Sequence, residues 1–176
     1  MCGICGTYNY SKERLVDECS LKTMARSMRH RGPDDEGFYI NGNIGLGHER
    51  LSIIDLSDAA RQPMSNEDGR YWIVLNGEIY NYLELRQGLI GKGHKFKSHS
   101  DTEVVLHLYE DNGPTCLNRL NGIFAFAIWD NREKTLFAAR DHFGVKPFYY
   151  AVKSGSFSFA SEIKAFFHAG MLRPEL

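Results

Sequence analysis

Ile123–Asp130 reads Ile-Phe-Ala-Phe-Ala-Ile-Trp-Asp, and this stretch decides the fold. Successive residues of a strand point to opposite faces, and here both faces are apolar. The polar residues 130–133 then turn the chain into a second strand at 135–140, which makes an antiparallel hairpin. Antiparallel sheets usually leave one face in water. A hairpin covered on both faces therefore predicts an α+β fold with two stacked antiparallel sheets between helices, a four-layer α/β/β/α sandwich.

Hydrophobic periodicity and turn residues predict the other elements. Asn41-Gly42 is a strong hairpin signal, and Ser154-Gly155 marks a second turn. Ser100 to Glu103 form a capping box, in which Ser100 caps a helix and Glu103 reaches back to it. We expect strands at 2–10, 36–40, 44–49 and 71–75, and helices at 15–29, 80–88, from 101 onward, and at 162–168.

Composition bounds the class of protein. The 176 residues suffice for one domain with a sizeable core, and 21 basic residues against 22 acidic ones leave a net charge of −1. No basic run indicates nucleic-acid binding, and no apolar stretch approaches the ~18–20 residues of a membrane span. The start of the chain lacks the pattern of a signal peptide. Four cysteines suit a reducing compartment, so we expect a cytoplasmic protein.

The start of the chain, Met1-Cys2-Gly3-Ile4, is the strongest chemical feature. Removal of Met1 places a thiol and a free α-amine on Cys2, with pKa values near ~8.5 and ~7.7–8. A nucleophile that carries its own base is an established catalytic device. The alternatives are an ordinary cysteine, or a redox or metal pair with Cys5 at Cys-x-x-Cys spacing. The seven histidines form no tight cluster in sequence, so we expect no metal site.

Three further positions carry polar groups in suggestive places. Arg50 precedes the run 51–54, which contains apolar residues and which we expect to be buried. A buried arginine needs an anionic partner, either a protein acid or a ligand carboxylate. Asn76-Gly77 lies between a strand and a helix, where it forms either a plain turn or a pair of oxyanion donors. Asp101, at the first helical position, either complements the helix dipole or holds a cation.

The order of these motifs resembles the class II glutamine amidotransferase domain, and most closely the glutaminase half of glutamine-dependent asparagine synthetases. The resemblance covers essentially all 176 residues, and it depends on the motifs together because each one alone is weak. The motifs are Cys2-Gly3-Ile4, Arg29 to Asp34, His48 to Ile53, Asn76 to Asn81, Ser100 to Glu103, Arg140-Asp141 with Lys146-Pro147, and Ser161 to Ala165.

The resemblance implies an N-terminal-nucleophile hydrolase fold over residues 1–176 and hydrolysis of the glutamine side-chain amide. Cys2 is then the nucleophile, and Asn76 with the Gly77 N–H forms the oxyanion hole. Arg50 binds the α-carboxylate of glutamine and Asp101 its α-ammonium. The full set of substrate-binding residues that the resemblance implies is Arg50, Leu51, Ser52, Ile53, Ile54, Asn76, Gly77, Glu78 and Asp101.

The same resemblance sets the expected cofactors and partners. The substrate is L-glutamine, and no cofactor or metal is needed in this domain. ATP and magnesium belong to a C-terminal synthetase domain, which we expect this chain to lack because Ser154–Ser158 is a poor match to the Ser-Gly-Gly-x-Asp-Ser loop. A homodimer is a further expectation. The alternatives are a glutaminase domain that feeds another acceptor, for example in sugar modification, and a non-catalytic regulatory domain.

Overall fold

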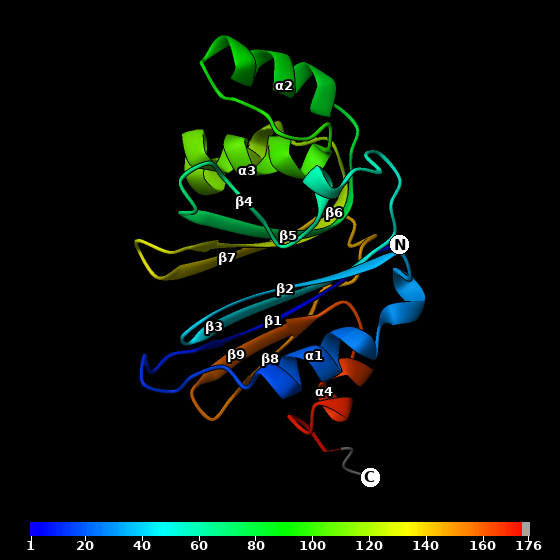
Figure 1. The fold of residues 1–176 in the computed structure, drawn as a ribbon, viewed down its shortest axis with the longest axis vertical. Helices are drawn as coiled ribbons and strands as arrows, with labels where there is room; N and C mark the ends of the chain where they lie inside the picture. The colour runs from blue at the N-terminus through cyan, green and yellow to red at the C-terminus, as the bar shows by residue number, and fades with distance from the viewer. Residues whose placement is uncertain (174–176) are drawn as a thin grey trace. The chain divides into compact units, whose positions relative to one another are not determined.

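The chain divides into two compact units in the computed structural model, which describes residues 1–173. Unit 1 comprises Met1–Leu51 together with the chain from Pro147 onward, and unit 2 comprises Ser52–Lys146. The last three residues of the expected 1–176 domain lie outside the described residues. Each unit has its own antiparallel sheet and its own helices (Figure 1).

Unit 1 is built on a five-stranded sheet with the order β2-β3-β1-β9-β8. The predicted hairpin at Asn41-Gly42 is confirmed, and Gly42 has a φ of +64°, the left-handed conformation that favours glycine. The predicted hairpin at Ser154-Gly155 is confirmed as well. The strands are β1 (Gly3–Asn9), β2 (Asp35–Asn41), β3 (Ile44–Arg50), β8 (Tyr149–Lys153) and β9 (Ser156–Ala160).

Two short helices, α1 (Glu18–Arg26) and α4 (Lys164–His168), pack together on unit 1, and α1 lies against β1 and β3 (Figure 1). The apolar residues Leu21, Met24 and Ala25 of α1 are buried in one cluster with Phe166 of α4. The predicted start at residue 15 is wrong, because the Asp17 side chain accepts the backbone N–H groups of Cys19 and Ser20 and so caps the helix. A single turn of 3₁₀ helix, Arg29–Arg31, follows.

Unit 2 is built on a four-stranded sheet with the order β4-β5-β6-β7. The hairpin that decided the fold is confirmed as β6 and β7. Phe124, Phe126 and Ile128 of β6 join one hydrophobic cluster with α2 and α3. The elements are β4 (Met64–Ser65), β5 (Tyr71–Ile79), β6 (Gly122–Asp130), β7 (Thr135–Arg140), α2 (Tyr82–Gly91), α3 (Asp101–Asn112), and the 3₁₀ helices Asp58–Ala60 and Gly113–Arg119.

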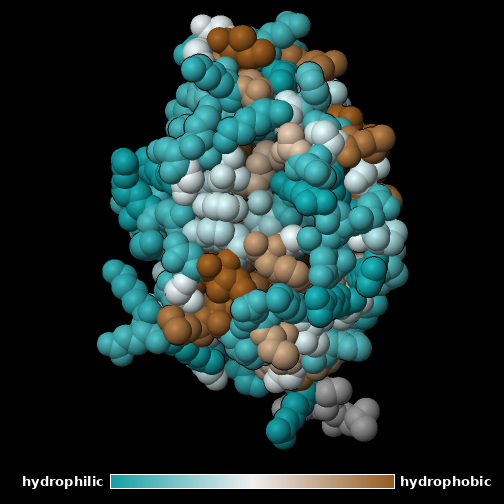
Figure 2. Space-filling model, in the orientation of Figure 1, coloured by the Kyte–Doolittle hydropathy of each residue, from teal (hydrophilic) through white to brown (hydrophobic). Residues whose placement is uncertain are grey.

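The predicted fold class is confirmed: the chain is α+β with two antiparallel sheets. Each unit contains one antiparallel sheet with helices of its own. Hydrophobic side chains are visible on the surface over α2 in Figure 2, and this helix exposes Leu83 and Ile90. Among residues 1–173, no helix combines the length and hydrophobicity that crossing a membrane requires.

One prediction about β5 is wrong. The strand does not stop before Asn76-Gly77 but continues through both residues to Ile79, paired with β6 throughout, and α2 starts only at Tyr82. A Cβ at position 77 would lie 2.3 Å from the carbonyl oxygen of Ile123. Gly77 therefore allows two strands to approach closely rather than forming a turn.

Candidate active site

Cys2 lies immediately before β1, in unit 1. The backbone N–H of Leu51 donates to its Sγ at 3.4 Å, and the Sγ in turn reaches the Leu51 carbonyl oxygen at 3.6 Å. An N–H group that donates to sulfur stabilises the thiolate form. The structure thus brings together two residues that are 49 positions apart and that were both expected in the site.

Arg31 holds the backbone of Cys2 in place, a role that the sequence analysis missed. Its Nε donates to the Cys2 carbonyl oxygen at 3.0 Å, and its Nη1 reaches Oε1 of Glu162 at 3.1 Å. Glu162 also binds His30 and Lys164. Although burial raises the pKa of Glu162, its hydrogen bonds with Arg31, Lys164 and His30 outweigh that effect and lower it. Two motifs 131 positions apart thereby support Cys2, the residue that precedes β1.

Ser161 fixes the next residues of the same strand. The Ile4 N–H donates to the Ser161 Oγ at 3.0 Å, and the Ser161 N–H donates to the Ile4 carbonyl oxygen at 2.9 Å. Ser161 is fully buried. Cys2 is therefore attached to a rigid strand whose backbone groups are satisfied on both sides.

Arg50 ends β3 and is buried, as expected, but the apolar run after it is not. Ile53 is 59% exposed and Ile54 37% exposed, so the prediction that this run is buried is wrong. The polar residues before the run are the buried ones, because they belong to β3, an interior strand with β2 on one side and β1 on the other. Leu51 and Ser52 are half-buried.

Gly77 presents its N–H at the edge of β5 that faces away from β6. Its ladder partner Phe124 directs its own N–H and carbonyl to Asp141, so Gly77 and Phe124 do not bond to each other. Backbone N–H groups two residues apart point to the same edge. Those on either side of Gly77 are bound by side chains: Leu75 N–H by Gln62 Oε1 at 2.6 Å, and Ile79 N–H by Asp101 Oδ2 at 2.9 Å.

Asn76 lies beside Gly77 with its side chain on the opposite face of the sheet from the α3 cluster. Its side chain is 1% exposed, and its Nδ2 is a buried donor without a hydrogen-bond partner among the described residues. A buried donor left without a partner costs about 1–3 kcal/mol. Such an atom is unusual, and a ligand acceptor is its natural partner.

Asp101 begins α3 and accepts the N–H of Ile79, so it is attached to the end of β5. Burial raises the pKa of Asp101, and the nearby carboxylate of Glu78 raises it further, against the backbone hydrogen bonds that it accepts. A cation bound here would relieve both effects. Unit 2 thus brings together Asn76, Gly77, Glu78 and Asp101.

The capping box at Ser100 is half confirmed. Ser100 Oγ accepts the Glu103 N–H at 3.3 Å, as predicted. Glu103, however, does not reach back to Ser100. Its carboxylate instead accepts the N–H groups of Lys97 and Ser98 at 2.8 and 2.7 Å, which orders the segment before α3.

Asp141, another motif residue, has a structural role. Its carboxylate accepts four backbone N–H groups, from Phe124, Phe143, Val145 and Lys146. Burial raises the pKa of Asp141, but these hydrogen bonds outweigh it and lower it. The carboxylate thereby holds the turn after β7.

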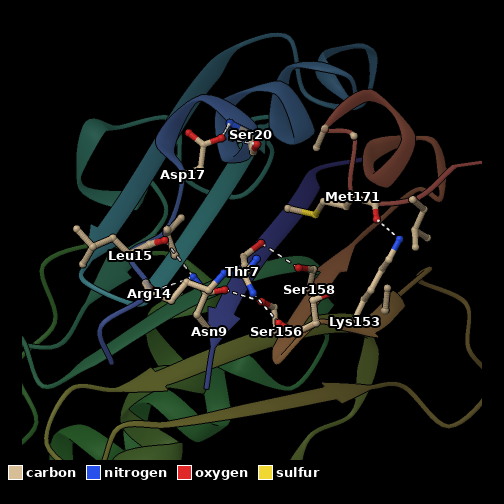
Figure 3. Close-up of a pocket in the computed structure, with 16 residues that line it drawn as sticks. Thr7, Asn9, Arg14, Leu15, Asp17, Ser20, Lys153, Ser156, Ser158 and Met171 are labelled. Atoms are coloured by element: carbon tan, nitrogen blue, oxygen red, sulfur yellow. Dashed lines mark hydrogen bonds between the residues drawn. The ribbon is translucent and has the colours of Figure 1, made fainter. Parts of the chain in front are cut away.

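Unit 1 also contains a cavity of about 420 Å³ beside β1, β8 and β9 (Figure 3). Polar side chains that line it bind one another: Thr7 Oγ1 lies 3.1 Å from Ser158 Oγ, and Ser156 Oγ donates to Asn9 Oδ1 at 2.6 Å. Ser154–Ser158 forms the turn and the strand here, in agreement with its predicted hairpin role.

The alternative of a Cys2–Cys5 redox pair is not favoured. Cys5 is fully buried in the hydrophobic cluster beneath α1, and burial raises the pKa of its thiol well above the ordinary range. A protonated, inaccessible thiol is a poor redox partner. All four cysteines, which belong to the described part of the chain, are thiols rather than disulfides.

The sequence is similar to a known domain family and to known enzymes along nearly its whole length. The glutamine amidotransferase domain family matches residues 1–176. Asparagine synthetase [glutamine-hydrolyzing] 3 of Bacillus subtilis is 44% identical over 94% of this chain and 27% of its own length. The corresponding enzyme of Brassica oleracea is 42% identical over 93% of this chain and 28% of its own length. The chain thus spans little more than a quarter of these relatives.

A solved structure supports the fold. Glutamine phosphoribosylpyrophosphate amidotransferase from Bacillus subtilis, complexed with ADP and GMP, superposes with a TM-score of 0.81 at 24% identity. The match covers 96% of this chain and 44% of that one. At this identity the likeness concerns the fold alone.

Proposed function

Because the chain belongs to the glutamine amidotransferase domain family, we propose that it hydrolyses the side-chain amide of glutamine to glutamate and ammonia. The observation that carries this proposal is the pair of donors in unit 2: the buried Asn76 Nδ2 without a partner, and the Gly77 N–H at the edge of β5. Two such donors suit the negative oxygen of a tetrahedral intermediate.

Cys2 acts as the nucleophile in this proposal. After removal of Met1, the α-amine of Cys2 accepts the thiol proton, and the sulfur attacks the amide carbon. Asn76 and Gly77 stabilise the oxyanion that forms. The C–N bond then breaks, the amine returns its proton to the leaving nitrogen, and ammonia departs from a γ-glutamyl thioester. Water attacks the thioester, releases glutamate and restores the thiol.

Charged side chains select the amino-acid end of the substrate. Arg50 binds the α-carboxylate, since its planar guanidinium matches two carboxylate oxygens. Asp101 and Glu78 bind the α-ammonium, which offsets the burial of Asp101 and the repulsion between the two carboxylates. Leu51, Ser52, Ile53 and Ile54 form the remaining contacts with substrate.

We further propose that the ammonia serves asparagine synthesis from aspartate and ATP in a synthetase domain beyond this chain, with a homodimer as its assembly. The support is the 44% identity to a glutamine-hydrolysing asparagine synthetase of greater length. The alternatives are another ammonia acceptor or a regulatory domain without turnover. Asn76 Nδ2, buried without a partner, disfavours the regulatory alternative, because such a group costs stability without catalytic return.

The test incubates the purified chain with glutamine alone, and then with glutamine, aspartate and Mg-ATP. We expect glutamate and ammonia in equal amounts in both cases, and no asparagine. Cys2→Ala should abolish hydrolysis, while Cys5→Ala, a matched change at a buried thiol, should retain it. Activity that persists in Cys2→Ala and disappears in Cys5→Ala would refute the assignment. Intact mass after reaction with a glutamine-like electrophile reports Met1 removal and one modification at Cys2.

A further inference from the structure

Two histidines that are separate in sequence meet in unit 2. His94 lies in the segment between α2 and α3, and His107 lies on α3. The helices α2 and α3 pack side by side (Figure 1). Their Nδ1 atoms are 3.2 Å apart. Glu110 Oε2 lies 3.3 Å from His107 Nδ1 and 3.9 Å from His94 Nδ1. The His107 side chain is only 1% exposed and that of His94 14%.

The outer nitrogen of each ring faces a carboxylate. His94 Nε2 lies 2.9 Å from Asp111 Oδ1, and His107 Nε2 lies 3.9 Å from Glu103 Oε1. A carboxylate only accepts hydrogen bonds, so a proton on His94 Nε2 is favoured over a lone pair there. His107 has a carboxylate near both of its nitrogens, and its Nδ1 presents a lone pair to Glu110 in the tautomer that carries the proton on Nε2. Neutral rings with this tautomer direct their Nδ1 lone pairs at each other and at Glu110.

In these tautomers three electron-rich atoms face one another at 3.2–3.9 Å, and they repel unless a positive charge lies among them. We propose that this cluster is a Zn²⁺ site with His94 Nδ1, His107 Nδ1 and Glu110 Oε2 as ligands. Zinc bonds of about 2.0–2.1 Å in tetrahedral geometry place ligand atoms about 3.3–3.4 Å apart, which two of the three distances match. The third closes with a small rotation of Glu110.

The surroundings support a metal of this class. Metal-bound imidazoles characteristically donate their other N–H to a carboxylate. Asp111 is within hydrogen-bond distance of His94 Nε2, and Glu103 lies 3.9 Å from His107 Nε2. Glu67 Oε2, 3.9 Å from His107 Nδ1, or a water supplies the fourth position. Imidazole nitrogen selects zinc over magnesium or calcium, which prefer oxygen ligands. The ion would attach the segment before Asp101 to α3.

This site revises the expectation that the histidines form no metal cluster. The two ligands are 13 positions apart, one in a loop and one in a helix, so no short sequence motif marks them. The site lies outside the groups assigned to glutamine chemistry, and its test needs no activity measurement.

The experiment measures Zn²⁺ binding to the full chain by equilibrium dialysis and elemental analysis. The starting protein is a Cys2→Ser, Cys19→Ser variant, which removes the two accessible thiols as competing ligands. We expect one Zn²⁺ per chain. His94→Gln should weaken binding more than 100-fold, and Asp111→Asn by about 10–100-fold, as removal of an outer partner does elsewhere. His168→Gln, at an exposed histidine of α4, is the matched control and should bind normally.

Co²⁺ binding gives a second readout. The visible absorption bands of tetrahedrally coordinated Co²⁺ should appear in the starting protein and be absent in His94→Gln. Far-UV circular dichroism without metal confirms that each variant folds. Should His94→Gln fail to fold, Glu110→Gln at an exposed helix position replaces it with the same expected loss. Absence of bound Zn²⁺, or binding that is unchanged in His94→Gln and Glu110→Gln, overturns the proposal and leaves a proton shared by the two rings as the explanation.

Discussion

The buried carboxyl group of Glu49 should make the free energy of unfolding of this protein fall as the pH rises. The residue lies on β3, an interior strand of its sheet, is 1% exposed, and has a buried Oε1 without a hydrogen-bond partner among the described residues. Arg26 does not neutralise it, because its guanidinium forms a bidentate pair with Glu36, opposite Glu49 in the ladder. Burial, with the negative charge of Glu36, raises the pKa of Glu49 from 4.5 to about 7.

The direction and size of the effect follow from that pKa. The neutral acid is favoured in the folded chain by about 3 kcal/mol, since each tenfold change in a protonation equilibrium is about 1.4 kcal/mol. Because the folded pKa is the higher one, this stabilisation is complete below pH 4.5 and is lost as the pH rises through 7. Between pH 5 and pH 8 the free energy of unfolding should lose about 2–3 kcal/mol from this group.

The assay is urea unfolding followed by circular dichroism at pH 5, 6, 7 and 8, for the native sequence and for Glu49→Gln. The difference between the two proteins removes the titration of all other groups. We expect Glu49→Gln to be the more stable protein at pH 8 and to lose that advantage toward pH 5. Glu13→Gln, at an exposed position of the same unit, should parallel the native chain. Equal pH dependence in the native chain and Glu49→Gln would refute the reasoning.

Three further predictions concern the active site and the sheet. Asn76→Ala should lower kcat by roughly 10²–10³ with little change in KM, as loss of one oxyanion donor does; steady-state glutamate release measures this, and an intact kcat with a raised KM would show that Asn76 binds substrate instead. Arg50→Ala and Asp101→Ala should each lower kcat/KM by an amount equivalent to about 2–5 kcal/mol, because each leaves one charge of glutamine without its partner; normal kcat/KM in either variant would remove that residue from the site. Gly77→Ala should destabilise the chain by about 1–3 kcal/mol in urea unfolding, because its Cβ would lie 2.3 Å from Ile123 O. Gly88→Ala, in the open on α2, should instead stabilise the chain by about 0.5–1 kcal/mol, and equal effects at the two positions would contradict the steric account.

Local patterns predicted the elements whose determinants are local. The apolar run of β6 is buried as expected, and the apolar residues of α1 pack into the cluster beneath that helix. Ser100 was recognised as a cap because its partner is three residues away. Asn76-Gly77 was misread because the reason for its glycine is the backbone of β6, more than 40 positions later, which no short window contains.

The candidate site followed less from pattern than from the resemblance to a family. Periodicity could not show that the apolar residues 53 and 54 are exposed while Glu49 and Arg50 are buried, since hydrophobicity alone predicts the reverse. The support of Cys2 by Arg31 and Glu162 depends on contacts across 131 positions. The meeting of His94 with His107 depends on how a loop packs on α3. Such pairings become visible only when the chain is folded.

The edge of β5 has a consequence for solubility. An uncovered strand edge is a template on which another chain can add a strand, and it is therefore a common starting point for aggregation. Here β4 pairs only with Trp72 and Ile73. Beyond β4, side chains bind the edge: the Leu75 N–H donates to Gln62 Oε1, and the Ile79 N–H donates to Asp101 Oδ2. An incoming strand would need both positions. The protein can therefore keep the Gly77 N–H accessible to a small molecule while it denies the same edge to another polypeptide.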